Sequence, residues 1–320
     1  MGPEPDLPSI YRFLAYRETD ASQETFFKNV LALPPAHTLL YAPSKNSPKI
    51  ERYWDLDRSA EIRYAESRNY PEHLLELLRG SVKIRLRSDV PVGACLSGGL
   101  DSSSQLRWIS LAKYAAAQMK GNGMKSIAGM VPHQLLARSK WLSGSFLEPV
   151  SLTPEFSKIA AGPPTQAPRK FKSSLHNELY QQLTCSMLPK LLRFADRSSM
   201  AFSREVRLPY LDHRVVEFLF AIPESQKIQG AATKFILREA MRGRLPDKVL
   251  RRTDKKGFDT PQSAWLLGAM RPWVEDILHS NSFRQRGWID TRRLCERALR
   301  SRLGPGDARP AHPRIAATVL

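Results

Sequence analysis

Apolar residues recur at helical spacing through the segment that follows Pro71. After the adjacent pair Leu74 and Leu75, apolar residues follow at steps of three or four up to Arg87: Leu78, Val82 and Leu86. This period indicates a helix with one buried face, and proline suits its first turn. The same kind of pattern predicts further helices over residues 176–194, 215–220, 234–242 and 265–278.

A different pattern follows the first of these helices. Residues 90–96 form an apolar run without alternation, which is typical of a strand buried in a parallel sheet. The run leads directly into Ser97–Ser103, with the sequence Ser-Gly-Gly-Leu-Asp-Ser-Ser. A helix is expected from Ser102 to about Met119, and residues 126–131 suggest one more strand. Strand, loop and helix in this order are typical of α/β proteins.

The two ends of the chain look different from its middle. Residues 31–41 predict a turn followed by a strand, because two consecutive prolines exclude a helix there. A polar linker is expected over residues 58–67. The last twenty residues are rich in glycine and proline and are expected to be disordered. The expected division is a β-rich segment 1–56, a main domain 57–300 and a tail 301–320.

Composition favours a soluble globular protein of the cytoplasm. Hydrophobic residues make up 42% and charged residues 25% of the 320 positions. No apolar run approaches the roughly 20 residues that a membrane helix needs, and the N-terminus lacks the layout of a signal peptide. The three cysteines, Cys95, Cys185 and Cys295, are far apart, so neither a disulfide framework nor a zinc site is expected.

The chain is strongly basic, with a formal net charge of +18. Such a charge fits either a nucleic-acid partner or a small anionic ligand. The basic residues are spread along the chain, and no aromatic ladder for stacking bases accompanies them. Nucleic acid is therefore the less favoured partner, and a solvated basic surface with a local phosphate site is preferred.

The loop Ser97–Ser103 has the chemistry of such a phosphate site. Glycines let backbone N–H groups approach an anion, and the helix that follows adds its positive end. The serine hydroxyls are further donors, whereas the carboxylate of Asp101 suits a Mg²⁺ ion that bridges it to phosphate oxygens. The Gly-Lys-Ser/Thr ending of a Walker loop is missing. The alternative is a plain Gly-Ser turn whose aspartate caps a helix.

Several strings together resemble the synthetase domain of glutamine-hydrolysing asparagine synthetase. They occur in the family's order and extend over roughly residues 9–290. The matching segments are residues 33–37, 53–55, 85–94, 97–103, 192–201, 205–213, 234–240 and 252–261. The resemblance implies a PP-loop ATP pyrophosphatase fold of the adenine nucleotide alpha hydrolase type. This is an α/β fold, here with a reduced parallel sheet and a large helical C-terminal part.

The resemblance also implies a reaction. Aspartate, or a related carboxylate, would attack ATP to give β-aspartyl-AMP and pyrophosphate, and ammonia would then release AMP. The implied cofactors are ATP and Mg²⁺. Asp101 and Lys234 are the implied catalytic residues, and Asp101 is also the implied metal ligand. The implied cofactor-binding residues are Leu96, Ser97, Gly98, Gly99, Asp101, Ser102 and Ser103. The implied substrate-binding residues are Asp196, Arg197, Glu205, Arg207 and Asp212.

Each of these roles has a structural alternative. A lysine near the α-phosphate would offset charge in the transition states, but Lys234 also fits a solvated helix lysine. The charged substrate-binding set equally fits a buried ion network that positions helices. Arg238 and residues 256–258 are expected to be structural.

The sequence departs from the family in two places. Gly2 stands where the family's glutaminase domain has its cysteine nucleophile, so ammonia would come from solution or from a separate glutaminase subunit. The family's second acidic loop is also missing, and residues 141–147 keep a Ser-Gly pair without acids. Three hypotheses follow: an ATP-dependent amidoligase, an inactive remnant or partner-binding pseudoenzyme, and, less favoured, a basic PP-loop protein acting on RNA.

Overall fold

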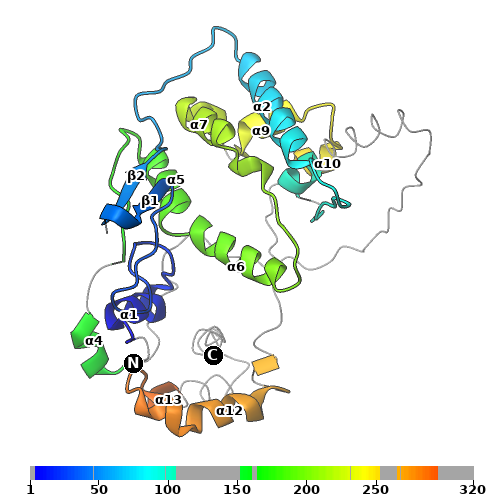
Figure 1. Ribbon diagram of the computed structural model, residues 1–320. Coiled ribbons are helices and arrows are strands. Elements are labelled where there is room, and N and C mark those ends of the chain that lie inside the picture. The colour runs from blue at the N-terminus through cyan, green and yellow to red at the C-terminus, as the bar shows by residue number, and fades with distance from the viewer. Residues whose placement is uncertain are drawn as a thin grey trace.

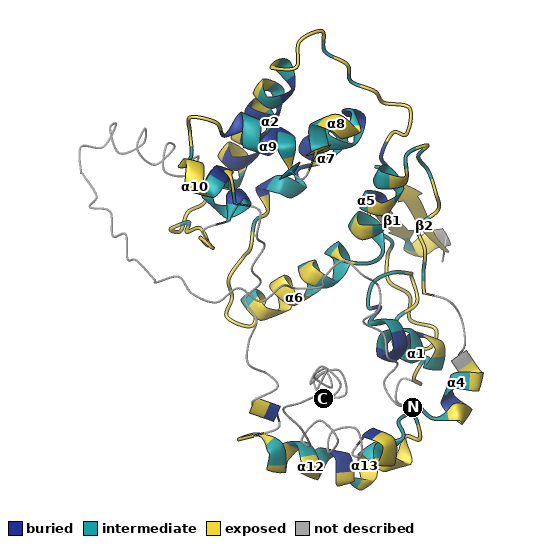
Figure 2. Ribbon diagram, turned by 180° about the vertical axis from the view of Figure 1, so that it is seen from behind, coloured by how far each residue is buried: buried dark blue, intermediate teal, exposed yellow. Residues whose placement is uncertain are grey.

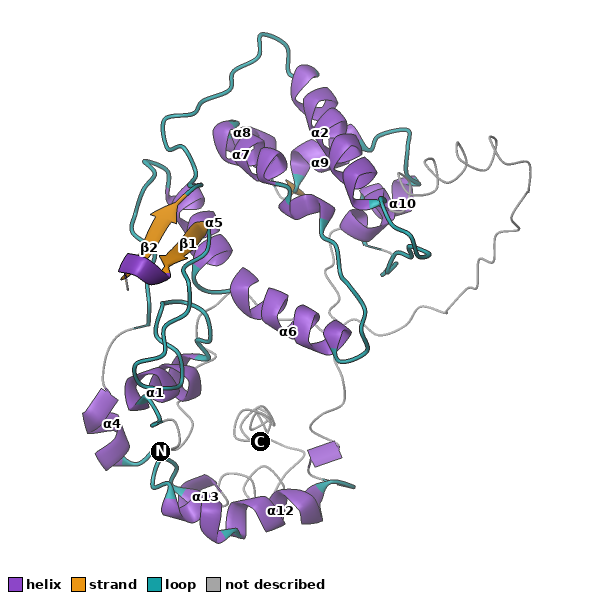
Figure 3. Ribbon diagram, viewed as in Figure 1, coloured by secondary structure: helices purple, strands orange, loops and turns teal. Residues whose placement is uncertain are grey.

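The computed structural model is mainly helical over the residues that it describes, and the paired strands there form two small hairpins (Figures 1 and 3). It describes residues 4–45, 47–97, 99–105, 152–160, 164–230, 232–252, 265–266 and 268–294. The expectations for the strand at 126–131, residues 141–147, residues 256–258 and the tail 301–320 lie outside these residues.

The N-terminal part begins with a helix that the β-rich expectation for residues 1–56 missed. Helix α1 (Leu7–Tyr16) starts where the side chain of Asp6 accepts a hydrogen bond from the backbone N–H of Ser9 at 2.9 Å. Proline in its first turn completes a standard helix start, so the signal was present in the sequence. The predicted strand is confirmed as β1 (His37–Ala42), which pairs antiparallel with β2 (Ser47–Arg52). The short 3₁₀ turn Pro43–Lys45 begins the connection between them.

Aromatic rings join α1 to elements from later in the chain. Tyr11 contacts Phe156 of α4 (Pro154–Ala160), with 5.8 Å between ring centroids, and Phe156 stacks on Trp288 at 5.7 Å. Trp288 follows the C-terminal helices α12 (Arg271–His279) and α13 (Asn281–Gln285). The predicted helix at 265–278 is therefore confirmed over its second half. These elements form the lower part of the view in Figure 1.

The main core lies between α2 (Asn69–Arg85), α7 (His213–Ala221) and α9 (Phe235–Ala240). All three helices were predicted from their apolar spacing and are confirmed. Their buried faces meet in one cluster (Figure 2), whose members include Leu74, Leu78, Val82, Val215, Phe218, Ile236 and Leu237. Burial of apolar surface of this kind stabilises a fold by about 25 cal/mol per Å². The short helices α8 (Glu224–Lys227) and α10 (Asp247–Leu250) flank this core.

The helix predicted over 176–194 is divided in two. Helix α5 (Ser174–Thr184) ends before α6 (Leu188–Met200) begins, and proline stands in the first turn of α6. A proline has no backbone N–H to continue a preceding helix, so the break falls there. None of the residues of α6 is buried, and the ring of Phe194 is 60% exposed.

The parallel sheet expected for an α/β fold is not shown. In the described part of the chain, the sheets are β1–β2 and a hairpin of β3 (Ile228–Gln229) with β4 (Ala232–Thr233), both antiparallel. Residues 90–96 are not a strand, and the prediction of a buried one was wrong. Val90 is 70% exposed and Leu96 is 55% exposed. An apolar run becomes a buried strand only where neighbouring strands pair with it and helices cover it, and no described segment does either.

Candidate functional site

The loop after residue 96 folds back on itself through its own hydroxyl groups. The hydroxyl of Ser102 accepts a hydrogen bond from the backbone N–H of Ser97 at 3.2 Å and lies 3.0 Å from the Ser97 hydroxyl. Ser102 Oγ also donates to the carbonyl of Gly99 at 3.2 Å. A helical turn follows, because the N–H of Ser103 bonds to the same carbonyl. Gly98 lies outside the described residues.

Leu100 of the loop and Ser104 directly after it anchor the loop to the core. Leu100 is 7% exposed and packs in the core cluster. Ser104 is fully buried, donates to the carbonyl of Asp101 at 2.7 Å, and hydrogen bonds to the hydroxyl of Tyr210. Burial raises the pKa of Tyr210 far above its ordinary value, so this phenol stays protonated. The sequence interpretation missed Ser104 and Tyr210, although both stand within or beside the strings that it used.

Lys234 comes to this loop from far along the chain. It stands between β4 and α9 with a left-handed backbone (φ 56°, ψ 38°), which turns the hairpin into the helix. Its ammonium forms an ion pair with the carboxylate of Asp101, a residue 133 positions earlier. Both side chains are 49% exposed, so the pair faces solvent. The two residues expected to be catalytic therefore meet at the expected loop.

Arg238 holds the turn that carries Lys234. Its guanidinium donates to the carbonyl of Thr233 at 2.8 Å and to that of Arg252 at 3.0 Å, and it also bonds to the carbonyl of Leu250. These bonds join β4, α9 and the end of α10. The structure thus gives Arg238 a structural part, as the sequence suggested.

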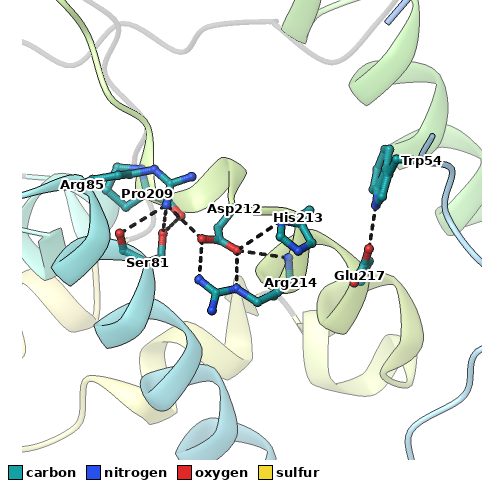
Figure 4. Close-up of polar contacts among 8 residues, drawn as sticks. All are labelled: Trp54, Ser81, Arg85, Pro209, Asp212, His213, Arg214 and Glu217. Carbon is teal, nitrogen blue, oxygen red and sulfur yellow. Dashed lines mark hydrogen bonds and ion pairs between the residues drawn. The ribbon is translucent and has the colours of Figure 1, made fainter. Parts of the chain in front are cut away.

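Asp212 is the centre of a buried ion network (Figure 4). Its carboxylate accepts from Arg85 of α2 at 2.9 Å and from two nitrogens of Arg214 at 2.8 and 2.9 Å, and it caps α7 through the Arg214 N–H. The guanidinium of Arg214, and after it that of Arg85, hold the pKa of this carboxyl far below its ordinary value. Ser81 extends the network by donating to the carbonyl of Pro209 at 2.7 Å. This geometry matches the structural alternative for Asp212.

Glu205 and Arg207 form the second half of this region. Arg207 binds both carboxylate oxygens of Glu205 at 2.8 Å and donates to the carbonyls of Arg85 and Arg87 at 2.8 and 2.5 Å. An open groove of about 750 Å³ lies along these residues. The carboxylates of Glu205 and Asp212 are occupied by arginines, so arginine and histidine side chains dominate the groove: Arg85, Arg87, Arg207, His213 and Arg214.

Asp196 and Arg197 lie elsewhere. Both are exposed on α6, and neither lines the groove. The charged residues expected to bind substrate are therefore split, with three beside the groove and two on a helix that Figure 3 shows apart from α2 and α9. The resemblance to the family had grouped them in one substrate site.

The backbone of the loop is open to solvent at Gly99. A Cβ atom built at Gly99 would lie 3.5 Å from Ser97 Oγ and would meet nothing else within 4 Å. Magnesium usually takes one or two carboxylates together with water and substrate phosphates, so the half-exposed Asp101 fits its needs. Among the described residues there is no group of three acidic, histidine or cysteine side chains that would hold a metal unaided.

Known proteins are similar to the part of the chain that contains the loop and Lys234. The family model described as asparagine synthase matches residues 73–120 and 104–314. Asparagine synthetase [glutamine-hydrolyzing] 1 of Bacillus subtilis is 35% identical over 109 residues, which are 34% of this chain and 17% of that protein. A putative asparagine synthetase [glutamine-hydrolyzing] 2 of Methanocaldococcus jannaschii is 40% identical over 83 residues, 26% of this chain and 16% of the relative.

A further relative carries a different description. Amidase chry2 of Gibberella zeae is 39% identical over 89 residues, 27% of this chain and 13% of that protein. The chain thus spans less than a fifth of the length of each of these curated relatives. No helix in the described ranges has the length and apolarity to cross a membrane. The matched family model covers most of the chain and includes both the loop and Lys234, and the chain belongs to the asparagine synthase family.

Proposed function

We propose that this chain binds the polyphosphate of ATP at Ser97–Ser103 and acts as an ATP-dependent amidoligase. The observation that carries the proposal is the ion pair between Asp101 and Lys234, which joins a Ser/Gly loop to a lysine 133 residues away. A structural salt bridge that is half exposed on both sides contributes little to stability. A pair of this kind is better explained by a ligand that both side chains serve.

The acyl substrate in this proposal is aspartate or a related carboxylate. Its carboxylate oxygen forms a bond to the α-phosphorus of ATP, the bond to the β-phosphate oxygen breaks, and pyrophosphate leaves. Ammonia, from solution or from a separate glutaminase subunit, then attacks the acyl carbon and displaces AMP. Charge builds on phosphoryl and carbonyl oxygens in both steps, and a fixed ammonium stabilises it.

The hydroxyl, backbone N–H and carboxylate groups of the loop have separate tasks in this scheme. The hydroxyls of Ser97 and Ser102 and the N–H groups of the glycine turn donate to phosphate oxygens. Mg²⁺ held by Asp101 would neutralise phosphate charge when it is bound. Lys234 is then free to exchange its carboxylate partner for the phosphate oxygens. Tyr210 and Ser104 keep the turn in place through the Asp101 carbonyl.

A second candidate is a partner-binding pseudoenzyme that has lost turnover. The specific observation in its favour is the exposure of Val90 and Leu96, which flank the stretch that precedes the loop. A nucleotide site of this fold type normally rests on a sheet, and the missing acidic loop removes a further catalytic group. In this case ATP binding persists without chemistry.

ATP–pyrophosphate exchange, measured with and without aspartate, separates the candidates. Aspartate-dependent exchange that is lost in Asp101→Asn and in Lys234→Ala supports the amidoligase. A useful control is Lys248→Ala, which removes an exposed lysine from α10 and leaves the loop intact. Binding of Mg·ATP by calorimetry without any exchange supports the pseudoenzyme, whereas absence of both refutes the assignment of the loop.

A further inference from the structure

A second cavity lies away from the loop, against the C-terminal end of α7. It has a volume of about 940 Å³, within the range of small-molecule sites. Its walls are the linker around Arg58–Arg63, the residues that lead into α5, and the turn at Pro223. It shares no residue with the groove beside Asp212.

The walls of this cavity are tied together by contacts between distant segments. The N–H of Ile62 donates to the carbonyl of Ala221 at 3.0 Å, which fixes the linker to α7. Lys170, only 7% exposed, forms an ion pair with Asp55 at 2.7 Å and lies 4.8 Å from the centre of the Tyr180 ring. These contacts make the cavity preformed, so binding there need not order a loose loop.

One wall is aromatic. Phe171 stacks on His176 with ring centroids 5.7 Å apart at 29°, and Phe220 lies 5.4 Å from Phe171 and 6.0 Å from His176. All three residues line the cavity. Burial lowers the pKa of His176, and the nearby Lys227 ammonium lowers it further. The imidazole is thus mostly neutral at pH 7, and the three rings form an uncharged stacking surface.

The rim of the cavity is positively charged. Four cationic side chains, from Arg58, Arg63, Lys170 and Lys172, face two carboxylates, from Glu61 and Glu224. Arg63 is paired with Glu61 at 2.6 Å, and Lys170 with Asp55. Glu224 accepts a hydrogen bond from Ser173.

Of these four cationic side chains, Arg58 and Lys172 remain without a carboxylate partner among the described residues. Both are exposed, and neither has an ion-pair partner within the described ranges. They provide two free positive charges beside the aromatic wall. The N-terminal end of α5, which begins at this cavity, adds its positive dipole.

We infer that this cavity is a binding site for a planar aromatic anion of the nucleoside monophosphate class. The base stacks on the wall of Phe171, His176 and Phe220, and the phosphate contacts Arg58 and Lys172. Neither half of the ligand is sufficient, because the exposed cations are screened by water and stacking alone contributes about 1–3 kcal/mol per base. This site is separate from the loop at Ser97 and does not depend on the function proposed for it.

Calorimetric titration with AMP tests the inference on the full chain. A Lys234→Ala variant is used as the background, because loss of this ammonium weakens any binding of AMP at the loop at Ser97. Adenosine and ribose 5-phosphate supply the base and the phosphate separately. We expect AMP to bind at least tenfold more tightly than either.

The variants for this test are chosen for matched chemistry. Replacing Arg58 and Lys172 together by alanine is expected to weaken AMP binding about tenfold, and Phe220→Leu is expected to weaken it several-fold while keeping an apolar side chain. The control is Arg68→Ala, which removes an arginine from the position directly before α2, outside the cavity, where Arg68 pairs with Glu66. Circular dichroism shows whether each variant remains folded.

Three results would overturn the inference. The first is absence of AMP binding at millimolar concentration in the Lys234→Ala background. The second is equal affinity for AMP and ribose 5-phosphate, which would mean that the rings take no part. The third is equal weakening by Arg68→Ala and by the Arg58 and Lys172 double substitution, which would mean attraction to net charge alone.

Discussion

The substitution Asp212→Asn isolates the charge at the centre of the buried network. The carboxylate is 5% exposed, whereas its partners Arg85 and Arg214 are 25% and 41% exposed. Asparagine keeps the shape of the side chain and caps a helix as well as aspartate does, so α7 retains its N-cap. The change therefore removes the negative charge and one of the two acceptor oxygens, and with that oxygen the hydrogen bonds that Oδ2 accepts from Arg85 and Arg214.

The expected loss of stability follows from these exposures. Removing one partner of a fully buried ion pair costs about 3–5 kcal/mol, and an exposed pair contributes about 0–1 kcal/mol. Arg85 is mostly enclosed and Arg214 is partly solvated, so we expect Asp212→Asn to lower the free energy of unfolding by about 2–3 kcal/mol at pH 7. Urea unfolding followed by circular dichroism at 222 nm measures it.

The effect of pH has a definite sign. The folded-state pKa of Asp212 is lowered from the ordinary 3.8, so its contribution is present above that value and is lost as the pH falls further. The difference in the free energy of unfolding between the wild type and Asp212→Asn should therefore become smaller below about pH 4. The matched control is Asp247→Asn, at an exposed pair with Arg251, with an expected change below about 0.5 kcal/mol. Equal effects of the two substitutions at pH 7 would refute the reasoning.

The remaining predictions concern backbone and anchoring. Gly80→Ala is expected to stabilise by about 0.5–1 kcal/mol, because this glycine lies inside α2 with open space around it. Gly230→Ala is expected to destabilise by about 1 kcal/mol, because its φ is +57°; thermal unfolding of both variants tests the pair, and equal signs would contradict it. Tyr210→Phe removes the hydroxyl that contacts Ser104 and should lower the free energy of unfolding, measured in urea, by about 1 kcal/mol. An unchanged free energy of unfolding would contradict this contact. Arg238→Lys should cost about 1–2 kcal/mol, because an ammonium cannot reach three carbonyls as a guanidinium does, and retention of full stability would argue against the structural part.

Local patterns in the sequence predicted the core helices well. The apolar spacing of α2 and α7 reflects burial of one helix face, which is a property of each segment alone. The sequence analysis missed the break between α5 and α6, although a proline in the first turn of α6 indicates it. It also missed the start of α1, which the Asp6 cap and a proline indicate. The strand expected at residues 90–96 failed for a different reason, because pairing partners elsewhere in the chain decide whether an apolar run becomes a strand.

The sequence by itself predicted a phosphate-binding loop at Ser97–Ser103 and a catalytic role for Lys234, and it indicated the family to which the chain belongs. Only the tertiary structure brought Lys234 to Asp101, because the core between α2, α7 and α9 sets their separation. It also assigned Asp212 to an ion network, placed Asp196 and Arg197 on an exposed helix, and formed the aromatic cavity beside α7. A motif specifies which groups are present, whereas burial and the pairing of charges depend on segments that meet only in the folded chain.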